Sequence, residues 1–172
     1  MRIYKLSITN NYAYLVEENA ELINKHRCYF RSSFKTDERI FLKIADNDDS
    51  PVGDYAEVYI PVFSKKSLDC LLPLISSEVH YIEWSLGQTP MYGIQVPSIN
   101  NCIDWSHSVF NSITPHLIVF KQYAFVETEL KDKNIFKIEN NPFVYVSQRF
   151  VDIVKKNYLT NFGFELVYDG NE

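Results

Sequence analysis

The sequence predicts an α+β fold: a single domain with a largely antiparallel sheet and a few short helices. Short segments with apolar residues at every second position recur along the chain, as in half-buried strands. Only two segments show the spacing of three to four residues that marks one face of a helix. The chain has 172 residues, of which 46% are hydrophobic. This length and composition suit one domain with a buried core.

The first elements are predicted to be strands. Residues 3–8 and 12–16 flank the sequence Thr-Asn-Asn, and this arrangement predicts a β-hairpin. Residues 17–38 are polar and mixed, and they show no clear pattern. Residues 39–44 predict another strand, whose apolar positions are Ile40, Leu42 and Ile44.

A further strand is predicted for residues 55–63, in which Val58, Ile60 and Val62 fall at every second position. Ser64 then takes the N-cap position of a helix. The apolar face of that helix is formed by Leu68, Leu71, Leu72 and Ile75. Pro73 has no backbone N–H, so we expect the helix to end or kink there.

The middle of the chain predicts two strands, over residues 79–85 and 91–96, joined by a turn at 87–90. Pro97 cannot donate a ladder hydrogen bond and is expected to end the second strand. Residues 117–120 form a short apolar run, typical of a buried strand.

The last third predicts a strand at 135–138, an Asn-Asn-Pro turn, a strand at 143–146, a helix capped by Ser147 and a final strand at 159–166. The expected inward face of the helix is formed by Phe150, Val151, Val154 and Tyr158. Lys155 and Lys156 follow near its C-terminal end, where positive charge suits the helix dipole.

Charge and cysteine content limit the classes of function. The net charge of −5 does not favour direct nucleic-acid binding, which needs a clustered basic face, but it suits a basic protein partner. The chain shows neither a signal peptide nor a segment long enough to span a bilayer, so we expect a cytoplasmic protein without a membrane partner. We expect Cys28, Cys70 and Cys102 to be free thiols. Nothing in the sequence sets the oligomeric state.

The segment Asp104-Trp105-Ser106-His107 contains the residue types of a catalytic triad. It lacks a G-x-S-x-G elbow, and adjacency in sequence is not triad geometry, so we expect Asp104 to cap a turn instead. Cys102 lies beside the apolar Ile103 and is expected to be buried and inert. A small hydrolase centred on Asp104, His107 and Cys102 is the enzymatic alternative.

The sequence predicts neither a metal nor a cofactor. Asp46, Asp48, Ser50 and Glu57 have the spacing of an EF-hand, but Pro51 occupies the position that requires Gly, and the flanks are predicted strands. The histidines and cysteines show no paired zinc-ligand spacing. The chain also lacks a Walker A loop and a Rossmann fingerprint.

The order of these segments resembles a family of bacterial immunity proteins, the cytosolic antidotes of polymorphic and contact-dependent toxins. The resemblance covers most of residues 58–168, while residues 1–57 form a variable N-terminal part. It is carried by the strand, serine and Leu-rich helix of 61–72, the Tyr-containing strand and Asp-Trp pair of 91–108, the Phe-Lys strand of 135–138, the Tyr-Val-Ser helix start and the closing Gly-Phe-Glu strand. It implies a single immunity domain, 1–172, that binds a cognate toxin in the cytoplasm, occludes it and carries no catalytic residues.

Two regions are candidates for toxin binding, because a toxin that attacks nucleic acid is basic. The acidic region comprises Asp46, Asp48, Asp49, Asp54 and Glu57. Its alternative role is that of a solvated connector. The aromatic set comprises Tyr81, Trp84 and Trp105, although most of these aromatic residues are expected in the core. An adaptor role in a secretion apparatus is the remaining alternative function.

Overall fold

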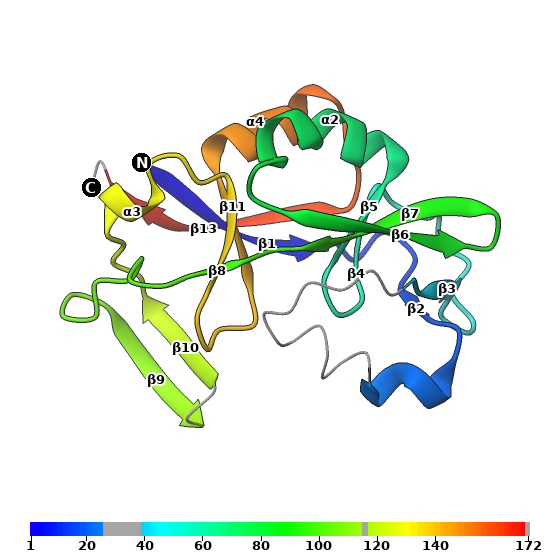
Figure 1. Cartoon of the computed structure of the whole chain (residues 1–172), viewed down its shortest axis with the longest axis horizontal. Coiled ribbons are helices and arrows are strands. Elements are labelled where there is room, and N and C mark those ends of the chain that lie inside the picture. The colour runs from blue at the N-terminus through cyan, green and yellow to red at the C-terminus, as the bar shows by residue number, and fades with distance from the viewer. Residues whose placement is uncertain (26–38, 115–116, 171–172) are drawn as a thin grey trace.

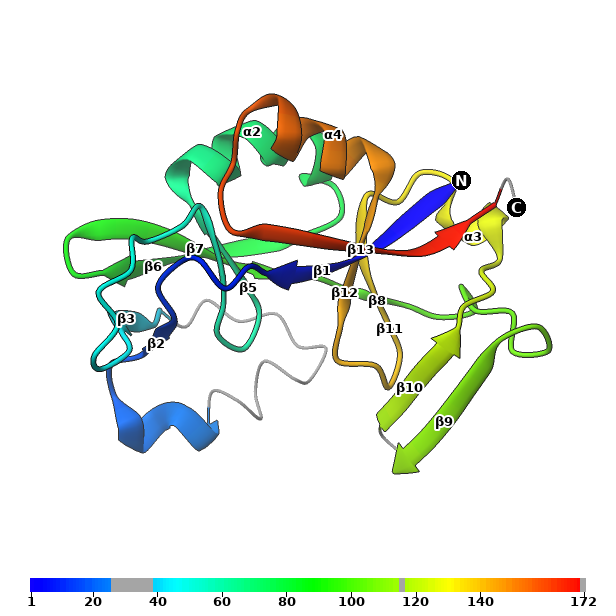
Figure 2. The ribbon, with the colours of Figure 1, turned by 180° about the vertical axis from the view of Figure 1, so that it is seen from behind.

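The computed structural model describes residues 1–25, 39–114 and 117–170. It confirms the α+β class: a five-stranded sheet, a six-stranded sheet and a two-stranded sheet, with mostly antiparallel pairing. Figures 1 and 2 show two helices lying side by side over the region where the two large sheets meet. The two-stranded sheet projects from one end of the molecule (Figure 1).

The five-stranded sheet joins the beginning of the chain to its end. Its order is β13-β1-β12-β11-β8, and all pairs are antiparallel except β11 with β8. The strands are β1 (Arg2–Ile8), β8 (Ser98–Ile99), β11 (Ile135–Ile138), β12 (Val144–Ser147) and β13 (Phe162–Asp169). Because β1 lies between β12 and β13, the first residues of the chain are held by strands more than a hundred residues away.

The six-stranded sheet has the order β2-β3-β6-β7-β5-β4. Its strands are β2 (Leu15–Glu17), β3 (Phe41–Ile44), β4 (Tyr55–Glu57), β5 (Pro61–Ser64), β6 (His80–Leu86) and β7 (Thr89–Gln95). The β6–β7 hairpin turns through Gly87 and Gln88, and Gly87 has a φ of 57°, which favours glycine. As predicted, β7 ends before Pro97.

Both predicted helices form: α2 (Lys65–Ile75) and α4 (Gln148–Lys156). The Ser64 side chain accepts a hydrogen bond from the Ser67 N–H at 3.1 Å, and Ser147 does the same for Phe150 at 3.4 Å. These bonds satisfy N–H groups that have no partner inside the helix. The shorter elements are the 3₁₀ helix η1 (Ala20–Leu22) and the helix α3 (Glu127–Leu130).

An aromatic core lies beneath α2 and α4. The ring centroids of Phe63, Phe150 and Phe162 lie 5.7–6.4 Å apart, and Tyr55 stacks on Phe162 at 4.8 Å. All four side chains are buried. They come from β4, β5, α4 and β13, so this core ties both large sheets to α4. No helix in the described part of the chain is long and apolar enough to cross a bilayer.

Several predicted elements differ from the structure. Residues 3–8 and 12–16 do not form a hairpin, because β1 and β2 belong to different sheets. The continuous strand predicted over 55–63 is two strands, β4 and β5, paired antiparallel around a turn. Tyr158, expected to face inward, lies after α4 with a φ of 51° and 84% of its side chain exposed. Cys28 lies outside the described residues.

Candidate protein-binding surface

The segment that follows β8 brings three polar side chains together. The Asp104 carboxylate accepts hydrogen bonds from the Ser106 N–H at 3.0 Å and from the Ser106 hydroxyl at 2.5 Å. Its other oxygen lies 2.7 Å from Nδ1 of His107. These bonds hold the pKa of Asp104 down, at about 2.

This cluster does not have the geometry of a catalytic triad. In a triad, one ring nitrogen of the histidine contacts the carboxylate and the other contacts the nucleophile. Here Asp104 and the Ser106 hydroxyl, 3.0 Å away, both contact Nδ1 of His107. The Asp104 carboxylate also accepts from the backbone N–H of His107 at 3.3 Å. The expectation that Asp104 caps a turn is therefore confirmed.

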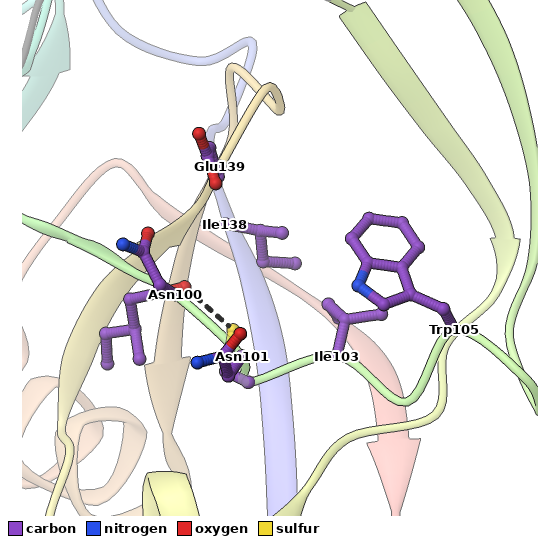
Figure 3. Close-up of a pocket in the computed structure, with 8 residues that line it drawn as sticks. Asn100, Asn101, Ile103, Trp105, Ile138 and Glu139 are labelled. Carbon is purple, nitrogen blue, oxygen red and sulfur yellow. Dashed lines mark hydrogen bonds between the residues drawn. The ribbon is translucent and has the colours of Figure 1, made fainter.

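Cys102, the third residue of the hydrolase alternative, is buried and donates to the Ile99 carbonyl at 3.3 Å. Burial raises the pKa of its thiol to about 11. Figure 3 shows the cavity beside it, which has a volume of about 70 Å³ and is lined in part by Asn101, Trp105 and Glu139. Cavities that bind small organic ligands are usually several times larger, about 300–1,000 Å³. The expectation that Cys102 is buried is therefore confirmed.

Trp105 lies where this segment meets the two-stranded sheet, which consists of β9 (Val109–Thr114) and β10 (Leu117–Gln122). Its indole packs edge-on against Phe110 at 5.2 Å and lies 5.9 Å from Phe120. Phe120 is buried, whereas 47% of Trp105 is exposed. Trp105 therefore packs against one face of the hairpin, and part of its ring remains exposed to solvent.

The hairpin has an inner and an outer face. Its inner face carries Phe110, Ile118 and Phe120. Phe120 belongs to a second buried cluster, which also contains Phe125 and Tyr145, and Ile118 packs against this cluster. We define the outer face by Val109, Ile113 and Val119. Val109 and Ile113 lie on the same side of β9 as Asn111, because side chains alternate along a strand, and Asn111 pairs with Val119 of β10.

The outer face presents Val109, Ile113 and Val119 around the polar Asn111, and its β9 side is open to solvent. All six residues of β9 are exposed, including 48% of Val109 and 62% of Ile113. Polar residues usually occupy the solvent side of an antiparallel sheet. An exposed apolar patch of this kind often marks a site of protein–protein contact.

The acidic region predicted for toxin binding contains residues that stabilise the loop and residues that are exposed to solvent. Asp48 accepts from the Tyr14 N–H at 2.8 Å and from the Ser50 N–H at 3.0 Å, and these bonds lower its pKa. Asp48 therefore maintains the shape of the loop. Asp46 is exposed and lies 3.2 Å from the Lys43 ammonium. Asp49 is exposed as well.

Asp54 is a structural residue as well. Its carboxylate accepts from the Thr160 N–H at 3.0 Å, from the Thr160 hydroxyl at 3.1 Å and from the Ser64 hydroxyl at 2.8 Å. It thereby joins the start of α2 to the segment before β13. Glu57 ends β4 and is exposed. Of the five predicted acidic residues, Asp46, Asp49 and Glu57 are therefore the exposed ones.

The predicted aromatic set does not form one surface. Trp84 is 1% exposed and belongs to the core, so its assignment to a binding surface was wrong. Tyr81 is exposed on β6 and contacts Tyr92 edge-on at 6.1 Å. Trp105 lies beside the β9–β10 hairpin instead. Tyr81 and Trp105 thus belong to separate parts of the fold.

Strand β9 is the part of this surface that the sequence analysis missed. Its six residues give no buried alternation, because none of them is buried. One signal was present: the chain has no Asp, Glu, Lys or Arg between Asp104 and Lys121. A long uncharged segment that is not buried is unusual on a protein surface.

No protein-family model matches this chain, and no curated protein is detectably similar to it.

Proposed function

We propose that this chain is an immunity protein, which binds a cognate toxin domain in the cytoplasm and neutralises it by occlusion. The proposal combines the sequence resemblance with one structural observation, the apolar and solvent-exposed outer face of the β9–β10 hairpin. A face of this kind suits a protein whose activity is to bind another protein.

Energetics support binding through this face. Complete burial of a Val or Ile side chain contributes roughly 1.5–3 kcal/mol. Val109 and Ile113 still expose about half of their surface, at 48% and 62%, so a partner can gain much of that contribution. Trp105 lies nearby on the other side of the hairpin, and tryptophan is frequent among the residues that dominate interface energies.

Charge suits the proposed partner. The chain carries a net charge of −5, and a toxin domain that attacks nucleic acid presents a basic surface. Opposite net charges accelerate association, whereas the apolar outer face would set the dissociation rate. Covering the toxin's substrate-binding face is sufficient for protection, and no chemical step by this chain is required.

The proposal is tested by co-expression with the toxin domain encoded immediately upstream, with growth and co-purification as readouts. Wild-type protein should restore growth and co-purify with the toxin. Ile113→Asp places a charge in the outer face, and it should weaken binding by at least about tenfold. Leu166→Asp is the matched control, because Leu166 is also a half-exposed strand residue, 50% exposed, but lies on β13.

Two outcomes contradict the proposal. Absence of protection and binding by the folded wild-type protein would contradict the immunity function. Equal binding by wild type and Ile113→Asp, with loss of binding in Leu166→Asp, would move the interface from the hairpin to the five-stranded sheet.

A further inference from the structure

Strand β9 has a second exposed feature, its outer edge. In the described part of the chain, β9 pairs only with β10. Both views in Figures 1 and 2 place β9 outside β10, at the periphery of the molecule and away from the large sheets. Among the described residues, no strand covers this side of Val109–Ile113, so another strand can pair there.

The other strands at sheet edges are short or charged. β2 and β4 have three residues each, and β8 has two. β13 has eight residues, but it carries Glu165 and Asp169. β10 has six residues, but it carries Lys121, and its Ile118 N–H and C=O already bond to the Asn140 carbonyl and the Asn141 side chain. Short length and charge are two of the ways in which proteins prevent edge-to-edge pairing.

Strand β9 uses neither of these protections. It has six residues, Val-Phe-Asn-Ser-Ile-Thr, without a charge or a proline. Its register irregularities lie at the two ends of the pairing with β10, so the middle of the strand is regular. Among the described edges, β9 is therefore the one best suited to accept an added strand.

The sequence of β9 is complementary to itself. If two copies pair antiparallel around a two-fold axis at Asn111, Val109 of each copy lies opposite Ile113 of the other. The two Asn111 side chains then lie opposite each other, and Phe110 lies opposite Ser112. Residues opposite each other in an antiparallel pair point to the same face, so this register keeps apolar side chains together.

The absence of charge on β9 makes this edge the one where a second copy meets the least local repulsion. Two copies of a chain with net charge −5 repel each other, and like charges placed directly opposite would add to that cost. In this register no charged side chain of β9 faces its copy, since the strand has none. Self-pairing of β13 would instead bring together two strands that each carry two carboxylates.

From these observations, we propose that the protein self-associates by antiparallel pairing of β9 with β9 of a second copy, centred on Asn111. The two hairpins then form a continuous sheet of order β10-β9-β9-β10. Both outer faces lie on the same side of this sheet. The large sheets of the two copies lie at its opposite ends, beyond each β10. The proposal does not depend on the toxin, since it concerns the edge of β9 and a second copy of the chain.

The interface is small, so association is expected to be weak and dependent on concentration. Interfaces that bury less than about 1,200 Å² are typical of weak and transient complexes. In sedimentation velocity, the wild-type protein should shift from monomer towards dimer over an about hundredfold increase in concentration. Asn111→Lys places two like charges face to face at the axis and should abolish this shift.

Cysteine cross-linking tests the register. In a Cys28→Ser, Cys70→Ser background, Asn111→Cys should form a disulfide-linked dimer, because Cα atoms directly opposite lie about 4.5–5.5 Å apart. Ile113→Cys is the matched control on the same face of β9. Its two copies lie roughly 13 Å apart along the strands, too far for a disulfide, so it should cross-link at least about tenfold more slowly.

Three results would overturn the proposal. The wild-type protein could remain monomeric over the whole concentration range. Asn111→Lys could dimerise as wild type does, which would place the interface elsewhere. Asn111→Cys and Ile113→Cys could cross-link at equal rates, which would indicate random collision instead of a fixed register. The wild-type and Asn111→Lys measurements do not depend on the folding of a cysteine variant.

Discussion

The Asp54 carboxylate accepts hydrogen bonds from three residues, one of which, Thr160, is distant in sequence from the other two. Burial alone would raise its pKa, but the hydrogen bonds donated by Thr160, Ser64 and Lys66 outweigh burial and lower it. A carboxylate with a lower pKa in the folded than in the unfolded state stabilises the fold above the unfolded pKa, about 4. This stabilisation is lost as pH falls through the folded pKa.

Asp54→Asn should therefore lower the free energy of unfolding by about 1–3 kcal/mol at neutral pH. The difference from wild type should shrink as pH falls below about 4. Urea unfolding at several pH values measures both effects. Asp46→Asn is the control, since Asp46 is 84% exposed and contacts only Lys43 among the described ion pairs. A difference that is constant with pH would contradict the assigned role of the charge.

Cys102 and Cys70 should differ in reactivity. Burial raises the pKa of Cys102 to about 11, so at pH 8 only about one thiol in a thousand is ionised. Cys70, on α2, is only partly buried. Iodoacetamide should modify Cys70 first in the folded protein, and the two rates should become similar in urea. Mass spectrometry of peptides gives both rates, and faster modification of Cys102 in the folded state would contradict this prediction.

At the scale of elements, α4 is held against the sheets by a large buried side chain, Phe150. Phe150 is 0% exposed and packs against Phe63, Phe162 and Phe164. Phe150→Ala removes this buried volume and leaves a cavity, so it should cost about 3–5 kcal/mol of stability. Phe41→Ala makes the same substitution at a site that is 63% exposed, and it should cost far less. Equal thermal midpoints for these two variants would contradict the packing of α4.

Strand β7 depends on a glycine beneath Trp84. A Cβ atom at Gly93 would lie 2.7 Å from the Trp84 ring, closer than contacting atoms approach. Gly93→Ala should therefore destabilise the fold by about 1–3 kcal/mol through overpacking. Trp84→Phe should relieve part of this cost in the double variant, as a double-mutant cycle would show. Additive effects of the two substitutions would contradict direct contact between them.

The accuracy of the sequence predictions depended on whether the signal was local. Ser147, followed by apolar residues at helical spacing, predicted α4 because both the cap and the buried face lie within a few turns. The Thr-Asn-Asn turn signal was misleading, because β1 pairs with β12 and β13 and not with its neighbour β2. Pairing partners so far apart in sequence leave no local trace.

The same limit applied to the candidate site. The side-chain spacing of Asp104 predicted a turn cap, and that contact lies within three residues. Trp84 was assigned to both the surface and the core, since alternation shows that a strand has two faces but not which of them is covered. Strand β9 gave no signal of alternation, because burial creates that pattern and β9 has no buried residue.

At the scale of the whole molecule, the two proposed contact regions lie far apart. Figures 1 and 2 place β3, where the acidic loop begins, at one end of the long axis and the β9–β10 hairpin near the other. We therefore expect Asp46 and Asp49, which follow β3, to lie outside a toxin contact centred on the outer face. Their charges can still act at long range, through the field that guides association.

The double variant Asp46→Asn, Asp49→Asn distinguishes steering from contact. Both side chains are exposed, and Asp48 is excluded because it accepts the Tyr14 and Ser50 N–H groups and maintains the loop. Removing two negative charges should slow association with the toxin by a small factor at low salt. It should leave the dissociation rate unchanged, since rim and distant charges act mainly on association.

Stopped-flow association over a range of ionic strength, combined with dissociation by competition, measures these quantities. Ile113→Asp should show the opposite pattern, with faster dissociation, because the lost contact lies inside the proposed interface. The association rates of wild type and the double variant should converge at high salt, where the Debye length falls to about 3 Å. Faster dissociation of the double variant at high salt would show that the acidic loop contacts the toxin, and it would move the interface from the hairpin to the β3 end of the molecule.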